Sequence, residues 1–269
     1  MEQKKKIILL SGPTASGKSK LAIKLAKYYN SEIINADSMQ IYKEISVLTS
    51  RPSLEDTKII KHHLYGFYSV KKKFSTGHWL KLAIEKIEEI WKKNLTPIIV
   101  GGTGLYFKAL TDGLVKIPDI PNSVIKDTRK LNKKIGQKDF FNRLVQLDPL
   151  AMKFILPSDA HRSMRAYDVK KFTNQSLFEL IKKTKSNFDK NIFKKIFINT
   201  PKEILSKKIG NRVEKMFAEG VEDEVKYFFK LKVYRELSAN KIIGIKEISD
   251  FLEKKMPLDE LREKISIKT

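Results

Sequence analysis

The run Ile7-Ile8-Leu9-Leu10-Ser11-Gly12-Pro13-Thr14-Ala15-Ser16-Gly17-Lys18-Ser19 decides the fold of this chain. Its last eight residues fit G-x-x-x-x-G-K-[ST], the pattern of a phosphate-binding loop. The four apolar residues at its start predict a buried strand, and apolar residues recur at helical spacing from 18 to 29. A strand before the loop and a helix after it are the context that this pattern requires.

The residue types of this loop suit a ligand with two or three phosphates. Two glycines let the backbone turn so that successive N–H groups converge on phosphate oxygens, and the N-terminus of the next helix adds partial positive charge. Lys18 adds a mobile cation, and Ser19 can place its hydroxyl on a phosphate-bound Mg²⁺. The predicted phosphate-binding residues are Gly12, Pro13, Thr14, Ala15, Ser16, Gly17, Lys18 and Ser19.

Strands and helices are predicted to alternate along much of the chain. Short apolar runs predict strands at 7–10, 32–35, 97–100 and 195–199. Amphipathic stretches predict helices at 18–29, 78–93, 104–110, 201–217, 221–231 and 241–254. We therefore expect an α/β fold, with a parallel sheet flanked by helices as in P-loop NTPases.

The middle of the chain breaks this alternation. From 119 to 189 the apolar residues follow helical periods without a convincing strand. We predict a helical insertion domain at 116–192, and a catalytic core formed by 1–115 together with 193–269. The stretch 116–195 has 19 Lys and Arg against 8 Asp and Glu. Such asymmetry favours a binding surface for a polyanion over an ordinary solvated face.

The composition of the whole chain points the same way. The 269 residues carry 54 Lys and Arg against 31 Asp and Glu, a net charge of +23, and the pI is near 9.8. That charge favours nucleic acid, an anionic surface or a phosphorylated substrate as partner. The absence of cysteine excludes disulfides, thiolate catalysis and Cys-ligated metals. No apolar run approaches the length of a membrane span or a signal-peptide core, so we expect a cytoplasmic protein without membrane contact.

Two strand ends carry the remaining chemical signals. The third strand ends in Gly101-Gly102-Thr103-Gly104, without the acid that holds Mg²⁺ in NTP-hydrolysing P-loop proteins. This argues against a motor or switch and leaves small-molecule kinases and other diphosphate chemistries open. Asp37 follows the second strand, where the carboxyl ends of parallel strands form the ligand crevice. It is a candidate proton acceptor, and an aspartate that only caps a turn or helix is the alternative.

Further stretches, taken together with the loop, give the chain a family likeness. It resembles the tRNA dimethylallyltransferases, also called isopentenyl-tRNA transferases, over nearly its whole length. The matching stretches run in family order and are 12–19, 37–42, 62–64, 101–106, 159–166, and 212–216 with Gly220, Glu224 and Val225. The loop pattern alone is weak evidence, but the ordered set is specific.

The resemblance implies a reaction and its partners. The family transfers a dimethylallyl group from dimethylallyl diphosphate to the N6 amine of an adenosine next to the tRNA anticodon. The loop would then hold diphosphate and Mg²⁺ rather than ATP, which fits the missing acid after the third strand. The implied partners are tRNA and the diphosphate donor, and we expect the enzyme to be a monomer.

The resemblance also implies roles for single residues. Asp37 would be the general base towards the adenine amine, and Thr103 would contact the reacting groups and orient Asp37 or the diphosphate. The implied tRNA-binding residues are Asp37, Ser38, Met39, Gln40, Thr103, His161, Arg162, Ser163, Met164 and Arg165. Arg162 and Arg165 are three positions apart and would share a helix face, and the alternative for both is a solvated face or an ion pair with Asp159 or Asp168.

The sequence departs from the family in places, and rival hypotheses stay open. Gly244-Ile245-Lys246-Glu247 stands where family members usually have Gly-Tyr-Lys-Glu, so an aromatic contact is lost. The family continues past the position of Thr269 into a basic segment, so we expect a member shortened by truncation or by nature. The rivals are an adenylate isopentenyltransferase, a P-loop small-molecule kinase and a non-catalytic RNA-binding protein. The basic insertion argues against the first, because a mononucleotide needs no such surface.

Overall fold

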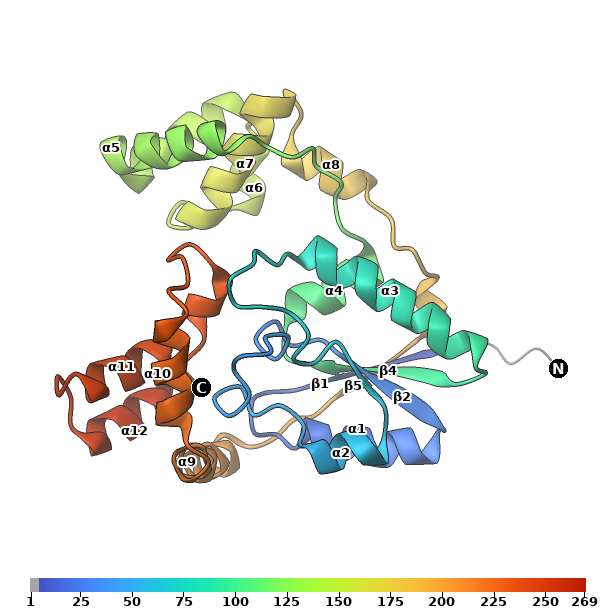
Figure 1. The fold of residues 1–269 in the computed structure, drawn as a ribbon. Helices are drawn as coiled ribbons and strands as arrows, with labels where there is room; N and C mark the ends of the chain where they lie inside the picture. Colours follow the sequence, from blue (N-terminus) through green and yellow to red (C-terminus); the bar gives the residue numbers. More distant parts are fainter. Residues whose placement is uncertain (1–4) are drawn as a thin grey trace. The chain divides into compact units, whose positions relative to one another are not determined.

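The computed structural model describes residues 5–269. Contacts within the chain divide it into two compact units. The core unit consists of residues 5–111 and 188–269, and the insertion unit consists of residues 112–187. In Figure 1 the insertion unit is coloured green to gold, and the two parts of the core unit are coloured blue to teal and orange to red.

A five-stranded parallel sheet forms the centre of the core unit, in the order β3-β2-β4-β1-β5. Its strands are β1 (Ile7–Ser11), β2 (Ser31–Asn35), β3 (His62–His63), β4 (Thr96–Gly101) and β5 (Phe193–Phe197). The central strands are buried along nearly their whole length, as expected for a parallel sheet covered on both faces. The predicted parallel α/β architecture is confirmed.

Helices cover both faces of this sheet, with α3 and α4 on one face and α1 on the other (Figure 1). Their bounds are α1 (Lys18–Tyr28), α2 (Leu54–Ile59), α3 (Thr76–Lys92) and α4 (Gly104–Asp112). On α3 the buried residues include Trp79, Ala83, Ile87 and Ile90, which recur at helical spacing. This stripe anchors α3 to the sheet through apolar burial.

The end of the chain is helical, and here the predicted boundaries need correction. The elements are η1 (Lys190–Ile192), α9 (Lys202–Ala218), α10 (Val221–Lys230), η2 (Ser238–Lys241), α11 (Ile245–Leu252) and α12 (Leu258–Lys268). The helix expected at 241–254 is present as α11, but it begins only at Ile245, because Gly244 has a left-handed φ of 100° that separates η2 from α11. The fourth predicted strand begins at Phe193 rather than Lys195, and its exposed lysines on the sheet edge mask its pattern.

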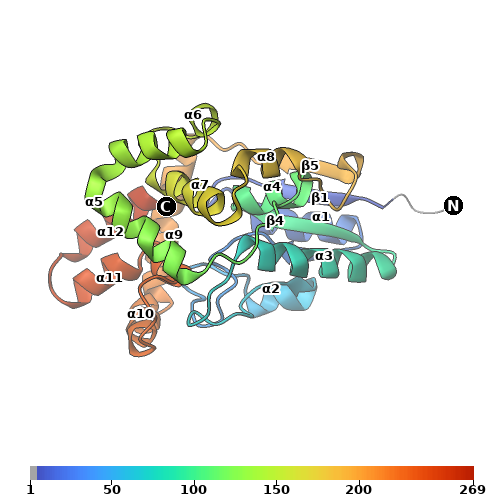
Figure 2. The same cartoon turned by 90° about the horizontal axis from the view of Figure 1, so that it is seen from above.

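The insertion unit is made of helices. These are α5 (Asn122–Leu147), α6 (Ala151–Phe154), α7 (Ala160–Thr173) and α8 (Leu177–Lys183). Figure 2 shows α7 beside α5, and the cluster between the helices includes Phe140, Leu144, Ala166 and Tyr167. Residues 112–187 are all described and contain no strand, as the sequence predicted. Across residues 5–269, no helix is both long enough and apolar enough to cross a bilayer.

Candidate active site

The phosphate loop lies between the end of β1 and the start of α1. Two of its residues have positive φ, Ala15 with 59° and Gly17 with 90°. At Gly12 an added Cβ would lie 3.0 Å from the carbonyl oxygen of Ile198, so a larger residue would press on the backbone after β5. The hydroxyl of Ser16 is buried and has no hydrogen-bond partner among the described residues. The loop therefore has the turn geometry that the sequence predicted and an unused donor within it.

Lys18 is folded back onto this loop. Its Nζ donates to the carbonyl oxygens of Gly12 at 2.9 Å and Pro13 at 2.6 Å. Burial lowers the pKa of Lys18, the carboxylate of Asp37 opposes this shift, and the guanidinium of Arg212 adds to it. A half-buried ammonium near the loop can change partners from carbonyl oxygens to phosphate oxygens.

Asp37 is held by the end of β2. The backbone N–H of Asp37 donates to Oδ1 of Asn35 at 2.8 Å, and Nδ2 of Asn35 donates to the carbonyls of Asp37 at 2.9 Å and Leu64 at 3.0 Å. Asn35 is fully buried. Oδ1 of Asp37 accepts from the backbone N–H of Met39 at 2.9 Å, so the turn role considered from the sequence is present. This bond also fixes the direction of the carboxylate, as a general base requires.

Thr103 reaches the same place from the end of β4. Its backbone N–H donates to the carbonyl of Ala36 at 3.1 Å, and its Oγ1 accepts from the backbone N–H of Ser38 at 3.0 Å. The approach of the two strand ends depends on Gly101, because an added Cβ there would lie 2.2 Å from the carbonyl carbon and oxygen of Ala36. The structure thus brings Ser38 and Thr103, predicted from separate motifs, into direct contact.

Buried aromatic rings lie near Asp37 and the end of β2. Trp79 donates from Nε1 to the carbonyl of Asn35 at 2.7 Å, and its ring stacks on Tyr106 with centroids 4.3 Å apart. Burial raises the pKa of the Tyr106 and Tyr65 phenols, and the nearby carboxylate of Asp37 raises both further. The carboxylate of Asp37 therefore lies close enough to two buried phenols to influence their pKa.

Arg212 on α9 is a buried cation near Asp37, and it lies in the stretch 212–216 that resembles the family. Burial lowers its pKa, and the carboxylate of Asp37 opposes that shift. Its Nη2 donates to the carbonyl of Leu48 at 3.5 Å, and its buried Nε has no partner among the described residues. A second cation therefore lies within electrostatic reach of both Lys18 and Asp37. The run 212–216 in the family match was the only sequence signal for it.

The other predicted tRNA-binding residues begin α7 in the insertion unit. Asp159 caps this helix by accepting from the backbone N–H of Arg162 at 3.0 Å, and it pairs with the Arg162 guanidinium at 3.0 Å. The ion pair considered as the alternative is therefore present, although the Arg162 side chain is 74% exposed. His161 and Arg165 are exposed, but Ser163 is fully buried, with its hydroxyl on the carbonyl of Asp159 at 2.7 Å. The tRNA contacts of this segment stay predictions.

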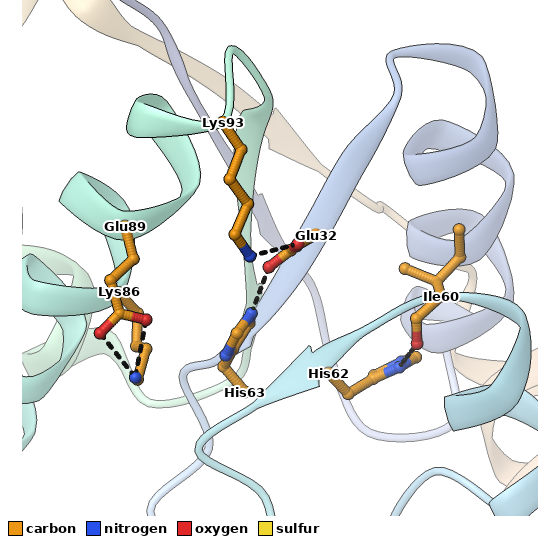
Figure 3. Close-up of polar contacts among 7 residues, drawn as sticks. All are labelled: Glu32, Ile60, His62, His63, Lys86, Glu89 and Lys93. Carbon is orange, nitrogen blue, oxygen red and sulfur yellow. Dashed lines mark hydrogen bonds and ion pairs between the residues drawn. The ribbon is translucent and has the colours of Figure 1, made fainter.

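A buried polar cluster ties the edge strand β3 to the sheet (Figure 3). His63 Nε2 lies 2.6 Å from one carboxylate oxygen of Glu32, and Lys93 Nζ lies 2.8 Å from the other. Burial lowers the pKa of His63, although the Glu32 carboxylate works against this. Burial alone would raise the pKa of Glu32, but the bonds from Lys93 and His63 hold it below its ordinary value. Among residues 5–269 no group of three or more His, Cys, Asp and Glu with the geometry of a metal site is found.

Fold and site together define an enzyme class. A phosphate loop, a fixed carboxylate and a threonine meet at the carboxyl ends of β1, β2 and β4, in a parallel sheet covered by helices. In parallel α/β folds this edge of the sheet forms the ligand crevice, and the arrangement is that of a P-loop-type enzyme.

Comparison with known proteins identifies the family. The family model described as IPP transferase matches residues 40–269, and the model described as Isopentenyl transferase matches residues 5–68. The tRNA dimethylallyltransferase of Pelagibacter ubique is 51% identical over 269 residues, which is 100% of this chain and 86% of that protein. The corresponding protein of Rickettsia felis is 42% identical over 99% of this chain and 86% of its own length. The chain belongs to the IPP transferase family, and it is a prenyltransferase.

Solved structures agree with this assignment. The tRNA isopentenylpyrophosphate transferase of Bacillus halodurans aligns with a TM-score of 0.68 and 28% identity, over 98% of this chain and 83% of that chain. A eukaryotic dimethylallyltransferase acting on tRNA aligns with a TM-score of 0.83 and 25% identity, over 98% of this chain and 67% of that chain. The predicted P-loop NTPase-like fold and the predicted family resemblance are confirmed.

Proposed function

We propose that this chain transfers a dimethylallyl group from dimethylallyl diphosphate to the N6 amine of an adenosine next to a tRNA anticodon, releasing diphosphate. The observation that carries the proposal is the meeting of the phosphate loop, Asp37 and Thr103 at one edge of the sheet. The 51% identity to a tRNA dimethylallyltransferase supports the choice of donor and acceptor.

The phosphate loop, Gly12 to Ser19, serves the leaving group. As the allylic C–O bond breaks, its electron pair stays on the diphosphate, and the growing negative charge needs cations and N–H donors. Lys18 is close enough to leave its two loop carbonyls for phosphate oxygens, and Arg212 adds a second cation. Ser19 is exposed in the first turn of α1 and offers the kind of oxygen ligand that Mg²⁺ prefers. Mg²⁺, when bound there with diphosphate, would neutralise part of that charge.

Asp37 serves the acceptor. An aromatic exocyclic amine is a weak nucleophile, so a carboxylate that accepts its proton as the C–N bond forms lowers the barrier. The bond from Met39 aims this carboxylate, and Thr103 fixes the segment that continues from it through Ser38. Water would capture an allylic cation, and the stacked rings of Trp79 and Tyr106 near the end of β2 would help to exclude it. Ser38, Met39 and Gln40 would hold the flipped adenine.

The insertion unit supplies the surface for the rest of the tRNA. Single-stranded loop nucleotides are gripped through their phosphates by Arg and Lys, which set the register without reading sequence. His161, Arg162 and Arg165 are exposed on α7 and suit this contact, and Met164 lies between them. Ser163 would act only indirectly, by fixing the start of the helix. The enzyme would work as a monomer in the cytoplasm, where its tRNA substrate is found.

The direct test is incubation of the purified chain with radiolabelled dimethylallyl diphosphate and an unmodified anticodon stem-loop, followed by nucleoside analysis. Label on the adenosine next to the anticodon is the expected result. Label on free AMP but not on the stem-loop would identify an adenylate prenyltransferase instead. Transfer of the γ-phosphate from ATP without prenylation would overturn the proposal in favour of a kinase.

The assignment of Asp37 has its own test. Asp37→Asn keeps the size of the side chain but cannot accept the amine proton, so we expect kcat to fall about 10²- to 10⁴-fold with little change in donor KM. Asp259→Asn is the matched control, because the Asp259 side chain is 99% exposed in the same unit. Prenylation by Asp37→Asn at the wild-type rate would refute the general-base role.

A further inference from the structure

The carboxylate of Glu224 on α10 binds the backbone of a turn at residues 46–48, far away in the sequence. Its Oε1 accepts from the backbone N–H of Ser46, from the Ser46 hydroxyl at 3.0 Å and from the backbone N–H of Val47 at 2.9 Å. Its Oε2 accepts from the backbone N–H of Leu48 at 2.9 Å. One carboxylate therefore satisfies three successive amides and a hydroxyl across 176 to 178 positions of sequence.

This arrangement depends on the negative charge of Glu224. Three successive backbone N–H groups that converge on one point form an anion-binding concavity. Bonds to a carboxylate are stronger than those to a neutral acceptor, and burial makes them costly to lose. A neutral amide of the same size would also turn an NH₂ group towards some of these donors. Glu224 belongs to the stretches that resemble the family, but no step of the proposed reaction uses its carboxylate.

The turn at residues 46–48 belongs to the segment that follows Asp37. Nε2 of Gln40 donates to the carbonyls of Thr49 at 2.9 Å and Ser50 at 3.0 Å. Nη1 of Arg51 donates to the carbonyl of Tyr42 at 3.2 Å. These bonds fold residues 40–51 into one loop, so the place where the turn is anchored also sets the place of Gln40.

Two other contacts hold the same turn from the C-terminal helices. Arg212 donates from Nη2 to the carbonyl of Leu48 at 3.5 Å, at the edge of hydrogen-bond distance. At Gly244 an added Cβ would lie 2.5 Å from Cδ1 of Leu48, so the side chain of Leu48 rests on that backbone. These contacts are weaker or apolar, which leaves Glu224 as the strong directional link between α10 and the turn.

We propose that Glu224 is a positioning residue for the acceptor: by holding Ser46, Val47 and Leu48 it fixes the segment of Ser38 to Gln40 against the target base. This inference rests on the proposed function, in which that segment holds the flipped adenine. It predicts that loss of the Glu224 carboxylate weakens use of the tRNA and leaves the diphosphate side of the site largely intact.

The test compares Glu224→Gln with the wild type in steady-state prenylation of an anticodon stem-loop. We expect the stem-loop KM to rise by about tenfold or more, while the KM for dimethylallyl diphosphate changes less than about twofold. Amide hydrogen exchange of the free enzyme should be faster at residues 38–51 in this variant and unchanged in β1 and β4. Asp223→Asn is the control, because it removes a neighbouring carboxylate of α10 that is exposed and pairs with Lys226 on the surface.

Each outcome decides the matter. Equal changes in both KM values, or normal KM values in a variant with only a lowered melting temperature, would overturn the positioning role. If Glu224→Gln does not fold, Glu224→Asp keeps the charge but withdraws it by one methylene, and the same split between the two KM values is required of it. A wild-type protein that does not prenylate the stem-loop would sink the proposed function instead. In that case unchanged hydrogen exchange at residues 38–51 in the variant would still overturn the anchor itself.

Discussion

The core unit and the insertion unit hold their predicted functional residues in different ways. Around Asp37 the hydrogen bonds of Asn35, Met39 and Ala36 all involve a backbone group. The ends of β2 and β4 also approach so closely that Gly101 has no room for a Cβ. On α7 the exposed Arg162 is held by one cap residue, Asp159. The core unit is thus built for fixed geometry, whereas the insertion unit offers charge on flexible side chains. Substitutions should therefore have steep effects in the first unit and graded effects in the second.

The largest effect is expected from Gly101→Ala. The new Cβ would lie 2.2 Å from the backbone of Ala36, so β4 and β2 would have to part at the site. We expect a destabilisation of about 3 kcal/mol or more and loss of activity even where the protein is folded. Both tryptophans, Trp79 and Trp91, lie in the core unit, so their fluorescence during urea unfolding reports on that unit.

The control for this substitution is Gly104→Ala, where no atom lies within 4 Å of the new Cβ. It should unfold at nearly the wild-type urea concentration. Equal stability of the two variants would show that the strand ends are not as tightly joined as the distances state.

The next effect is the acid sensitivity of the core unit. Burial holds the pKa of His63 below its ordinary value of 6.5, so the unfolded chain binds a proton that the folded chain does not. Stability should then fall as the pH drops below about 6.5, by up to about 1.4 kcal/mol per pH unit for this group. The depressed pKa of Glu32 acts in the same direction at lower pH.

The measurement is urea unfolding followed by tryptophan fluorescence between pH 5 and pH 8. His63→Gln should flatten the acid side of the stability profile, although its stability at pH 8 is expected to be lower because the bond to Glu32 is weakened. His161→Gln is the control, since His161 is exposed in the insertion unit. A profile that keeps its acid slope without His63 would assign that slope to other groups.

The smallest effect is expected on the insertion unit. Arg162→Ala removes one exposed charge that pairs with Asp159, and exposed pairs contribute little to stability. We expect the stem-loop KM to rise about threefold to fivefold. The slope of log binding constant against log salt concentration should fall by about one, as for the loss of one phosphate contact. The free energy of unfolding should stay within about 0.5 kcal/mol of the wild-type value.

Lys208→Ala on α9 is the comparison for Arg162→Ala, because Lys208 is equally basic and exposed but belongs to the core unit. It should leave the salt dependence unchanged. If both variants weaken binding alike, the excess charge acts as a general field, and the insertion unit has no particular contact with tRNA.

Features that depend on short stretches of sequence could be predicted from the sequence alone. The phosphate loop, the strand before it and the positions of Asp37 and Thr103 after their strands followed from short motifs and from the rule that parallel strands end at one edge. The amphipathic stripe of α3 was equally plain. Each of these signals lies within a few residues of the feature that it predicts.

The sequence was insufficient where structure depends on distant partners. β3 has two residues, and its attachment through His63 and Glu32 joins positions 31 residues apart. The tasks of Arg212 and Glu224 depend on contacts with a loop more than 160 positions away, which no periodicity records. Helix α12 was missed because the apolar period was followed only to 254.

The bonds of Lys18 have a consequence for how the loop discriminates among anions. Because the ammonium ties Gly12 and Pro13 together, these bonds preorganise the loop, and little conformational entropy should be lost when an anion binds. An incoming anion must, however, replace two hydrogen bonds that are already made. A weakly charged anion that offers Lys18 a single oxygen forms weaker hydrogen bonds than the two that it replaces, whereas a diphosphate forms stronger ones. Small common anions should therefore compete with these carbonyls for Lys18 less well than diphosphate does.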